Sequence, residues 1–319
     1  MLMLECAVPA AEVARQCERD FIEQDNRPDD ILTVLLGLHC DWMGLTLCRW
    51  LFKSHSVKRN TPSPPSSCSP SLYQAIAVTP SLRLAVLLDS PSVPLSDPRS
   101  QWSPFHMSPN MHVCDSGSGV CRTRVEQSSD AARGAVGVKS GLHVWEILWE
   151  PGQRGTHALI GVSTKHCPLQ MSGYTALVGA DAQTWGWELS SNQLWHSGWQ
   201  VGQYPVGDET WQGPLKVPER VLVVVDVDAG MLGYAVNSSF LGVAFRGLPR
   251  GEELYPAVSC VWGGARVRLR YLSGMGRDPP SLLSLCRLSV RQTMGTDRQT
   301  QTDRLPLPRA LQHHLLAKY

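Results

Sequence analysis

The 319-residue sequence predicts an all-β antiparallel sandwich followed by a small α-helical module. Residues 135–271 fall into short apolar or alternating runs that Gly, Pro and Asp separate, and none keeps a helical period. Many short strands with frequent turn signals are typical of a sandwich. After Tyr271 the pattern changes to one that predicts helices.

The clearest strands form a three-strand meander at residues 221–245. The run RVLVVVDVD is apolar on both faces, which indicates an interior strand. The segments MLGYAV and FLGVAF follow turns at AG and NSS, and Gly233 and Gly242 stand where we expect backbones to come close. Asp226 and Asp228 flank the first turn, so we expect them to stabilise it rather than to act as an acid–base pair.

These patterns divide the chain into three parts. Residues 1–80 are expected to form an irregular or partly helical N-terminal extension with a disordered linker, because residues 53–70 are rich in Pro, Ser and positive charge. Residues 81–276 are expected to form the sandwich, with Trp145, Trp185 and Trp187 packed in its core. Residues 277–319 are expected to form the helical module.

Residues 31–52 are apolar and long enough to span a bilayer, but His39, Asp41 and Arg49 lie within them. Each charge near the bilayer centre costs roughly 2.5–3.5 kcal/mol. A helical extension is therefore favoured over a membrane anchor, and we expect no membrane association. The first ten residues lack the basic segment that opens a signal peptide, so we expect a cytoplasmic protein.

Composition argues against several classes of protein. The 29 basic and 28 acidic side chains give a formal net charge of +1, which lacks the basic excess of nucleic-acid-binding proteins. The 10 Cys are scattered without CxxC pairs or zinc-finger spacing, so we expect reduced thiols, no metal and no cofactor.

No motif in the chain predicts catalysis, and we expect a non-enzymatic protein. Neither GxxxxGK nor GxGxxG occurs. The segment DSGSGV at 115–120 lacks the buried strand and following helix of a nucleophile elbow. His166 and Cys167 are adjacent, so their side chains would diverge on a strand.

The C-terminal module carries an apolar helix. Pro279, Pro280 and Ser281 form a helix start, and the pattern continues to about Met294 before Gly295. One narrow arc of this helix holds Leu282, Leu285, Cys286 and Ser289, and an adjoining stripe holds Leu283, Val290 and Met294. The combined face is too broad for one neighbour, so one stripe packs internally and the other is left for another chain. A self-buried helical hairpin is the alternative. A last short amphipathic helix follows LPLP.

The tail motifs resemble a SOCS box. The set Leu282, Leu285, Cys286 and Ser289 resembles its elongin-binding box. Downstream, LPLP resembles its cullin box, at Leu305, Pro306, Leu307 and Pro308. The two motifs occur in the right order, separated by a short polar stretch.

The upstream part resembles the SPRY domain- and SOCS box-containing adaptor family, through QSSDAARGAVGVKSGLHVWEI, GYTALVGADAQTWGWEL and LYPAVSCVWG. The resemblance covers about residues 81–319 and is nearest to members that bind inducible nitric oxide synthase. It implies a SPRY sandwich and a substrate receptor of an elongin B/C–Cullin-5 ubiquitin ligase with its RING partner. Such a receptor performs no chemistry itself and acts by proximity.

The resemblance also implies a peptide-binding surface for Asn-rich acidic motifs of the Asp-Ile-Asn-Asn-Asn type, as in inducible nitric oxide synthase. The matching positions are Arg122, Thr156, Tyr174, Leu177, Val261, Trp262 and Gly263. Trp262 offers an apolar wall, Gly263 permits close approach, and Arg122 is expected to meet an acidic side chain.

The chain departs from the family pattern at three positions. Arg124 and Glu126 replace a proline and an alanine that help line the peptide site, and Ala180 replaces a serine. These changes add charge and remove a hydroxyl, so affinity for the family peptide is expected to be reduced or redirected. The alternative function is a SPRY peptide-binding scaffold that acts without ubiquitylation.

Overall fold

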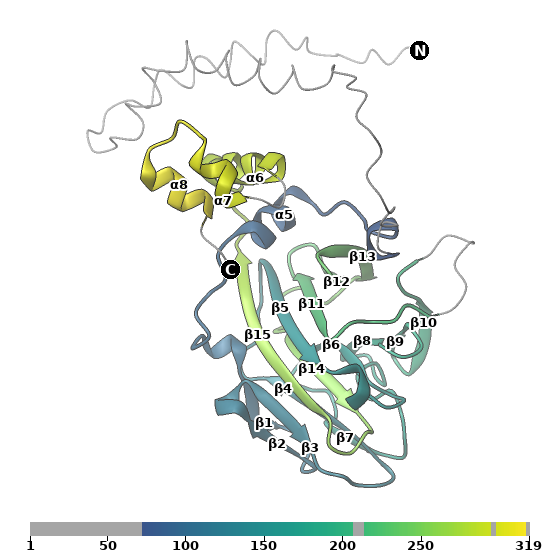
Figure 1. Ribbon diagram of the computed structural model, residues 1–319. Coiled ribbons are helices and arrows are strands. Elements are labelled where there is room, and N and C mark those ends of the chain that lie inside the picture. The colour runs from purple at the N-terminus through teal and green to yellow at the C-terminus, as the bar shows by residue number, and fades with distance from the viewer. Residues whose placement is uncertain (1–71, 207–213, 295–297, 317–319) are drawn as a thin grey trace, which may run out of the picture. The chain divides into compact units, whose positions relative to one another are not determined.

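The computed structural model describes residues 72–206, 214–294 and 298–316 (Figure 1). The apolar segment 31–52, the linker 53–70 and most of the expected N-terminal extension lie outside these residues. Among the described residues, no helix is both long enough and apolar enough to cross a membrane.

Two antiparallel sheets form the expected sandwich, which confirms the predicted fold class. The first sheet has the order β1-β4-β14-β6-β8-β9-β10, with β7 paired to β4. Its strands are β1 (Trp102–Met107), β4 (Ser128–Gly134), β6 (Leu159–Ser163), β7 (Gln170–Ser172), β8 (Thr184–Glu188), β9 (Gln193–His196), β10 (Trp199–Gln203) and β14 (Tyr255–Cys260).

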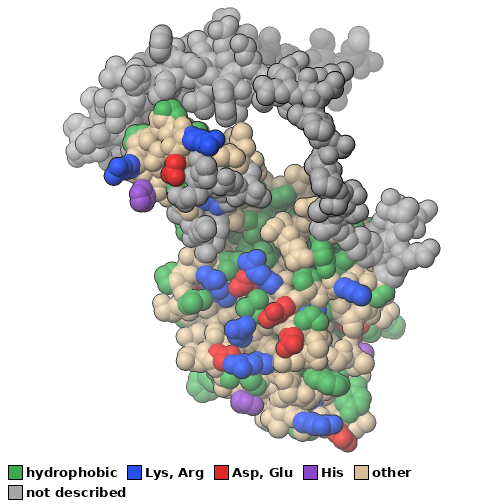
Figure 2. Space-filling model, in the orientation of Figure 1, with side chains coloured by type: hydrophobic (Ala, Val, Ile, Leu, Met, Phe, Trp, Pro, Cys, Tyr) green, Lys and Arg blue, Asp and Glu red, His purple; other side chains and the backbone are tan. Residues whose placement is uncertain are grey.

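The second sheet has the order β13-β12-β11-β5-β15-β3-β2. Its strands are β2 (Met111–Cys114), β3 (Gly119–Arg122), β5 (Leu142–Trp149), β11 (Arg220–Asp226), β12 (Met231–Val236), β13 (Ser239–Arg246) and β15 (Arg266–Met275). Short 3-10 turns lie at η1 (Pro98–Ser100), η2 (Asp115–Gly117) and η3 (Pro151–Gln153). On the face shown in Figure 2, basic and acidic side chains alternate over the sandwich, in keeping with the balanced charge.

The main core lies between the two sheets and contains Trp145, Trp185 and Trp187, as predicted. Trp145 and Trp187 are both 0% exposed. Strand β11 contributes Val221, Val223 and Val225 to this core, and its other face carries Leu222 and Val224 in a second cluster. The prediction of an interior strand with two apolar faces is therefore confirmed.

The meander of β11, β12 and β13 is also confirmed. Asp226 accepts a hydrogen bond from the Ala229 amide at 3.0 Å, which is the expected turn-stabilising contact. A Cβ atom on Gly233 would lie 2.4 Å from the carbonyl oxygen of Gly242. Only glycine allows this close approach of β12 and β13.

Two helices precede the sandwich strands: α4 (Leu72–Ala75) and α5 (Leu82–Asp89). Ser81 caps α5 by accepting a hydrogen bond from the Leu84 amide. Leu84 and Leu87 of α5 pack in the second cluster on the outer face of the seven-stranded sheet. The sequence placed the start of the folded part here but did not predict a helix, because six of its eight residues are apolar and show no amphipathic period.

Three helices follow the last strand. Helix α6 (Leu282–Met294) and helix α8 (Arg309–Leu316) agree with the two predicted helices, and α7 (Arg298–Asp303) lies in a polar stretch for which none was predicted. Ser281 caps α6, because its hydroxyl accepts a hydrogen bond from the Ser284 amide at 3.2 Å. The buried side of α6 holds Arg287, Leu288, Arg291 and Met294.

Candidate functional site

Four loops meet at one end of the sandwich. They are residues 123–127 after β3, 154–157 before β6, 173–177 after β7, and the β14–β15 turn at 261–265. The Gln127 amide donates a hydrogen bond to the Tyr174 hydroxyl at 3.2 Å, which joins two of these loops. Glycines allow the other contacts. A Cβ on Gly155 would lie 2.9 Å from the Cβ of Trp262, and one on Gly263 would lie 2.6 Å from Cγ of Arg124.

These loops form a surface that we name the peptide rim, which consists of the exposed side chains of Arg124, Thr156, Tyr174 and Trp262 and of the half-buried Gly263. Trp262 is 51% exposed and Tyr174 is 47% exposed. Thr156 and Arg124 are also exposed, while Val261 and Gly263 are half-buried. An exposed tryptophan and tyrosine beside hydroxyl and backbone groups suit an extended peptide, since aromatic anchors dominate binding energy and the polar groups set orientation.

Arg122 lies beneath the peptide rim and not on it. Its side chain is 0% exposed, and its Nε donates to the Asp130 carboxylate at 2.7 Å. Its Nη2 donates to the carbonyls of Val125 and Ser128, both at 2.9 Å. The expectation that Arg122 meets an acidic peptide side chain therefore differs from the structure, because this guanidinium is enclosed and holds the loop 123–127.

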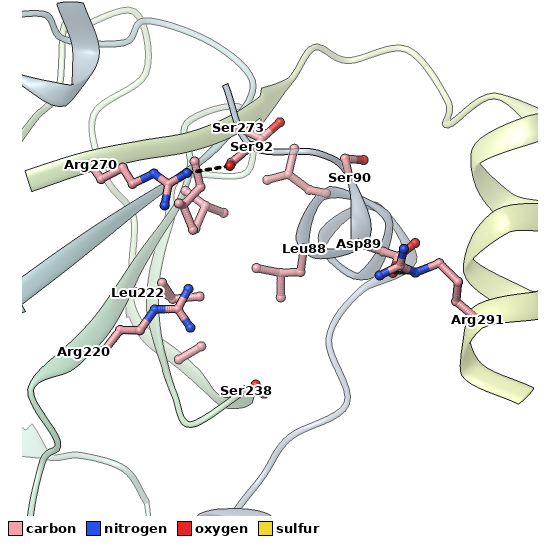
Figure 3. Close-up of a pocket in the computed structure, with 14 residues that line it drawn as sticks. Leu88, Asp89, Ser90, Ser92, Arg220, Leu222, Ser238, Arg270, Ser273 and Arg291 are labelled. Carbon is pink, nitrogen blue, oxygen red and sulfur yellow. Dashed lines mark hydrogen bonds and ion pairs between the residues drawn. The ribbon is translucent and has the colours of Figure 1, made fainter. Parts of the chain in front are cut away.

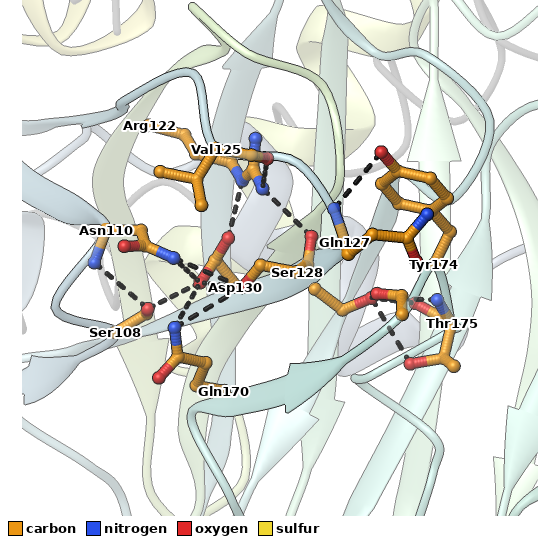
Figure 4. A network of polar contacts seen from close by, with 12 residues as sticks. Ser108, Asn110, Arg122, Val125, Gln127, Ser128, Asp130, Gln170, Tyr174 and Thr175 are labelled. Atoms are coloured by element: carbon orange, nitrogen blue, oxygen red, sulfur yellow. Dashed lines mark hydrogen bonds and ion pairs between the residues drawn. The ribbon is translucent and has the colours of Figure 1, made fainter.

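Asp130 is the centre of the polar network under the rim (Figure 4). Besides Arg122, it receives hydrogen bonds from Ser108 at 2.6 Å and from Asn110 and Ser128, both at 3.0 Å. Asp130 itself is 0% exposed. Sequence reasoning gave no role to Ser108, Asn110 or Asp130, because Asp130 lies 22 and 20 residues after the other two and only the pairing of β1 with β4 brings them together.

Leu177 also lies below the surface, with 1% of its area exposed. It packs in a cluster with Ala131, Leu159, Val178 and Ala257. Ala180 is half-buried against the same cluster, so its missing hydroxyl is not on the peptide rim. Leu177 therefore anchors the loop that presents Tyr174, and its side chain does not face solvent as a peptide contact.

The two remaining departures from the family pattern differ from Ala180 in exposure. Arg124 and Glu126 are both exposed. The aliphatic part of Arg124 lies against Gly263. Of the two arginines, Arg124 is therefore the one exposed on the rim, and Arg122 is enclosed beneath it.

Among the described residues, one polar cluster resembles a catalytic set in composition, and it consists of His157, Glu188 and Ser191. His157 Nδ1 lies 2.7 Å from one Glu188 oxygen, and the Ser191 hydroxyl donates to the other. The carboxylate stands between the hydroxyl and the imidazole, so the imidazole does not contact the serine hydroxyl as it would in a serine–histidine nucleophile pair. Among the described residues, no group of three or more His, Cys, Asp and Glu side chains could hold a metal ion.

The predicted elongin-binding arc of α6 faces solvent. Leu282 is 73% exposed, Cys286 and Ser289 are exposed, and Leu285 is half-buried. In the adjoining stripe, Leu283 is 46% exposed and Met294 is buried. The adjoining stripe is therefore only partly buried. Arg287 and Arg291 occupy positions on the buried side of α6, where the sequence predicted only apolar side chains. We name Leu282, Leu283, Leu285 and Cys286 the α6 ridge.

The LPLP segment forms the turn into α8. Leu305 and Leu307 are half-buried, and Pro306 and Pro308 are exposed. The Leu305 carbonyl accepts hydrogen bonds from the Leu307 amide at 2.8 Å and from Gln312 Nε2 at 3.2 Å. These bonds fix the two prolines at the surface.

A pocket of about 340 Å³ lies where α5, the outer face of the sheet and α6 approach one another (Figure 3). Leu88, Leu222 and Arg270 line it from α5 and the sheet, and Arg291 lines it from α6. Asp89 of α5 forms ion pairs with Arg291 at 2.8 Å and with Arg287 at 3.8 Å. This contact connects the sandwich to the C-terminal helices.

Comparison with known proteins adds two family matches to this geometry. Residues 142–271 match the SPRY domain, and residues 278–316 match the SOCS box. The chain is 47% identical to human SPRY domain-containing SOCS box protein 2 over 236 residues, which cover 73% of this chain and 89% of that protein. It is 44% identical to human SPRY domain-containing SOCS box protein 1, covering 73% and 86%.

A more distant relative matches over a similar length. Protein gustavus of Drosophila melanogaster is 40% identical over 257 residues, which cover 78% of this chain and 90% of the relative. Among solved structures, the SPRY domain of human HERC1 matches with 19% identity and a TM-score of 0.41, covering 53% of this chain and 97% of that one. With a sandwich, a C-terminal helical box and relatives matched over most of their length, this chain belongs to the SPRY domain-containing SOCS box protein family.

Proposed function

We propose that this chain is the substrate-recognition adaptor of an elongin B/C–Cullin-5 ubiquitin ligase and acts in the cytoplasm. The observation that carries the proposal is that one chain presents two separate surfaces with exposed large apolar side chains, the peptide rim on the SPRY domain and the α6 ridge on the SOCS box. A protein with two such surfaces can hold a substrate near a ubiquitin-charged partner, and this proximity accelerates transfer without chemistry of its own.

The α6 ridge is the proposed elongin C site, with elongin B bound to elongin C. Leu282 at 73% and Leu283 at 46% exposure are large apolar side chains at the start of one helix. Burying one such side chain stabilises a complex by roughly 1.5–3 kcal/mol. The smaller Cys286 and Ser289 lie about one and two turns after Leu282 and let a partner approach the helix closely.

The LPLP turn is the proposed contact for Cullin-5, which brings its RING partner. Pro306 and Pro308 are exposed and lie on a turn fixed by the Leu305 carbonyl. A rigid exposed turn loses little conformational entropy on binding.

The peptide rim is the proposed site for an extended, Asn-rich acidic peptide of the Asp-Ile-Asn-Asn-Asn type, and inducible nitric oxide synthase is the candidate substrate. Trp262 and Tyr174 supply aromatic walls, and loop backbone groups supply donors and acceptors to the Asn amides. The exposed cation Arg124 is the proposed partner of the peptide carboxylate, since Arg122 is already paired with Asp130.

Elongin capture tests the tail assignment. A Leu282→Ala/Cys286→Ala double variant should lose co-purification with elongin B/C, because it removes the exposed centre of the ridge. Leu95→Ala is the matched control, since Leu95 is another exposed leucine at 71% and lies outside the tail. Full elongin capture by the double variant would refute the assignment.

Cullin capture tests the LPLP turn separately. Replacing residues 305–308 with Ala-Gly-Ala-Gly should reduce Cullin-5 capture while elongin B/C still binds. Equal loss of both partners would indicate a folding defect in the box, and unchanged Cullin-5 capture would contradict the role of the turn.

Peptide titration tests the rim. Addition of an Asp-Ile-Asn-Asn-Asn peptide to the full chain should change the tryptophan fluorescence, and a scrambled peptide should not. The same titration with an Asn-Ile-Asn-Asn-Asn peptide measures the contribution of the carboxylate. If the unmodified peptide does not bind, this substrate class is excluded for the chain.

The scaffold alternative makes a different prediction about lifetime. If the chain promotes degradation, deletion of residues 278–319 should lengthen the half-life of a peptide-tagged substrate in cells. Equal half-lives with and without the box would favour a non-degradative SPRY peptide-binding scaffold.

A further inference from the structure

Two cysteines on the β2–β3 hairpin have their sulfur atoms in contact. Cys114 ends β2, Cys121 lies in β3, and their Sγ atoms are 2.8 Å apart. Both thiols are free and both residues are partly exposed. Neither residue belongs to the peptide rim or to the SOCS box, so the proposed function does not explain this pair.

The strand register explains how the two sulfurs meet. Cys114 pairs with Gly119 and Cys121 pairs with His112, so the cysteines are diagonal neighbours on one face of the hairpin. A Cβ on Gly119 would lie 2.7 Å from the Cys114 sulfur. The sulfur of Cys114 therefore lies over a glycine and reaches the neighbouring cysteine. A disulfide bond is about 2.05 Å long, so closing it shortens the separation by less than about 1 Å.

The surroundings give the two thiols different roles. Burial, and then the hydrogen bond with Cys121, raises the pKa of Cys114 to about 12. Cys114 therefore keeps its proton at neutral pH, which leaves Cys121 as the sulfur that attacks first. Arg266 of β15 pairs in register with Cys121 and adds a positive charge near both sulfurs, partly offset by its ion pair with Asp115.

We propose that Cys114 and Cys121 form a redox-active dithiol that a small-molecule disulfide of the glutathione class oxidises to a disulfide. The Cys121 thiolate attacks one sulfur of oxidised glutathione, the glutathione S–S bond breaks, and a glutathione thiolate leaves. Cys121 then carries no negative charge, which removes one cause of the raised pKa of Cys114.

Cys114 completes the exchange. It loses its proton to solvent, attacks the Cys121 sulfur and expels the second glutathione thiolate. The two protein thiols lose two electrons and two protons in total, and oxidised glutathione gains them as two thiols. Contact between the sulfurs makes this second step effectively intramolecular.

The disulfide would cross-link the hairpin that supports the peptide rim. Arg122 directly follows Cys121, and Asn110 precedes β2, and both belong to the Asp130 network. In a reducing compartment such bonds are usually transient and redox-sensing rather than structural. The site therefore offers a reversible covalent state of the domain, and it does not depend on the proposed ligase function.

Thiol trapping and mass spectrometry test the proposal on the full chain. The reduced protein is equilibrated in glutathione buffers of increasing oxidation, quenched with acid, alkylated and digested with trypsin. Both cysteines fall in one tryptic peptide, residues 100–122. We expect this peptide to lose both alkylated thiols together and to become lighter by two hydrogens than the reduced peptide.

Cys286 in the same sample is the internal reference, because it is an exposed single thiol. In a buffer in which peptide 100–122 carries a closed disulfide, Cys286 should carry a bound glutathione. Cys121→Ser should abolish the closed form, and Cys167→Ser, which removes a buried cysteine elsewhere, should preserve it. The proposal is overturned if peptide 100–122 stays doubly alkylated where Cys286 is modified, or if it accumulates glutathione without closing. Both contradicting outcomes are measured on the wild-type chain, so the test does not depend on whether a variant folds.

Discussion

Under the proposed function, Trp262 is the rim residue that we expect to contribute most to peptide binding. It is 51% exposed and packs over Gly155, so it presents a rigid apolar face without supporting the core. Trp262→Ala should weaken binding of the Asp-Ile-Asn-Asn-Asn peptide by about 30-fold, the effect of a hot spot of about 2 kcal/mol. Fluorescence anisotropy with a labelled peptide measures the loss.

The control for the exposed Trp262 is a fully buried tryptophan. Trp187 is 0% exposed, and Trp187→Ala should lower the free energy of unfolding by about 3–5 kcal/mol. Trp262→Ala should change that free energy by no more than about 0.5 kcal/mol. If Trp262→Ala unfolded the chain as Trp187→Ala does, its role would be structural.

Arg122 and Asp130 make a second prediction, which concerns stability. Both side chains are 0% exposed, so Arg122→Ala leaves a buried carboxylate without its cation. Such a change costs about 3–5 kcal/mol, and urea denaturation should show it as a lower midpoint. Arg124→Ala removes an exposed arginine two residues away and should leave the midpoint within about 0.5 kcal/mol of the parent. Loss of peptide binding without loss of stability in Arg122→Ala would contradict the supporting role.

His143 predicts how stability depends on pH. Burial lowers the pKa of His143 below its ordinary value of 6.5, while a hydrogen bond to the Ser140 carbonyl opposes the shift. The unfolded chain therefore binds a proton at a higher pH than the folded chain does. Stability should be fully present above pH 6.5 and should decline as the pH falls from 6.5 towards the lower folded-state pKa.

The measurement is the urea midpoint at several pH values between 7.5 and 5 for the parent and for His143→Gln. The parent should lose more stability over this range than the variant, because glutamine does not titrate. A parent that gains stability on acidification relative to His143→Gln would contradict the assignment.

At the scale of an element, α6 has one buried side and one exposed side, and we expect the first to stabilise the fold and the second to bind elongin C. Leu288 is 8% exposed and Leu282 is 73% exposed, and both are leucines of one helix. Leu288→Ala should lower the free energy of unfolding by about 2–5 kcal/mol. Leu282→Ala should leave it within about 0.5 kcal/mol and should affect elongin binding alone. Thermal denaturation of the two variants measures the difference, and equal destabilisation would mean that the ridge is part of the core.

The elements that sequence reasoning predicted are those with a strong local pattern. The meander β11–β13 has apolar runs between clear turns, and α6 has a proline start, a serine cap and a helical apolar period. Helices α5 and α7 were not predicted, because six of the eight residues of α5 are apolar and α7 is a six-residue polar segment, so neither shows an amphipathic period. For elements this short, packing and not local pattern selects the conformation.

At the scale of the whole molecule, Asp89 couples the sandwich to the SOCS box. Its carboxylate lies between α5 and α6 and forms ion pairs with Arg291 and Arg287. Arg291 also donates to the Leu315 carbonyl at 2.8 Å, which extends the connection to α8. Through these contacts, the Asp89 carboxylate links the SPRY domain to α6 and, by way of Arg291, to α8.

Asp89→Asn should loosen the SOCS box without unfolding the sandwich. Amide hydrogen exchange of α6 and α8 should become faster, by about 10-fold or more if the loss reaches 1.4 kcal/mol, while β11 should exchange as before. Asp303→Asn is the control, because Asp303 is exposed in the same module. Unchanged exchange in α6 and α8 of Asp89→Asn would show that Asp89 does not hold the box.

Along this chain the sequence by itself determined the sandwich, the helical box, the tail motifs and the aromatic residues at the loop ends. Those features depend on local periods, turn residues and short motifs, which are readable without knowing what lies next to them. Only the tertiary structure decided that Arg122 and Leu177 support the peptide rim from below, that Arg124 is its exposed cation, and that Cys114 touches Cys121. These facts depend on strand register and on which side chain is enclosed, and residues distant in the chain determine both.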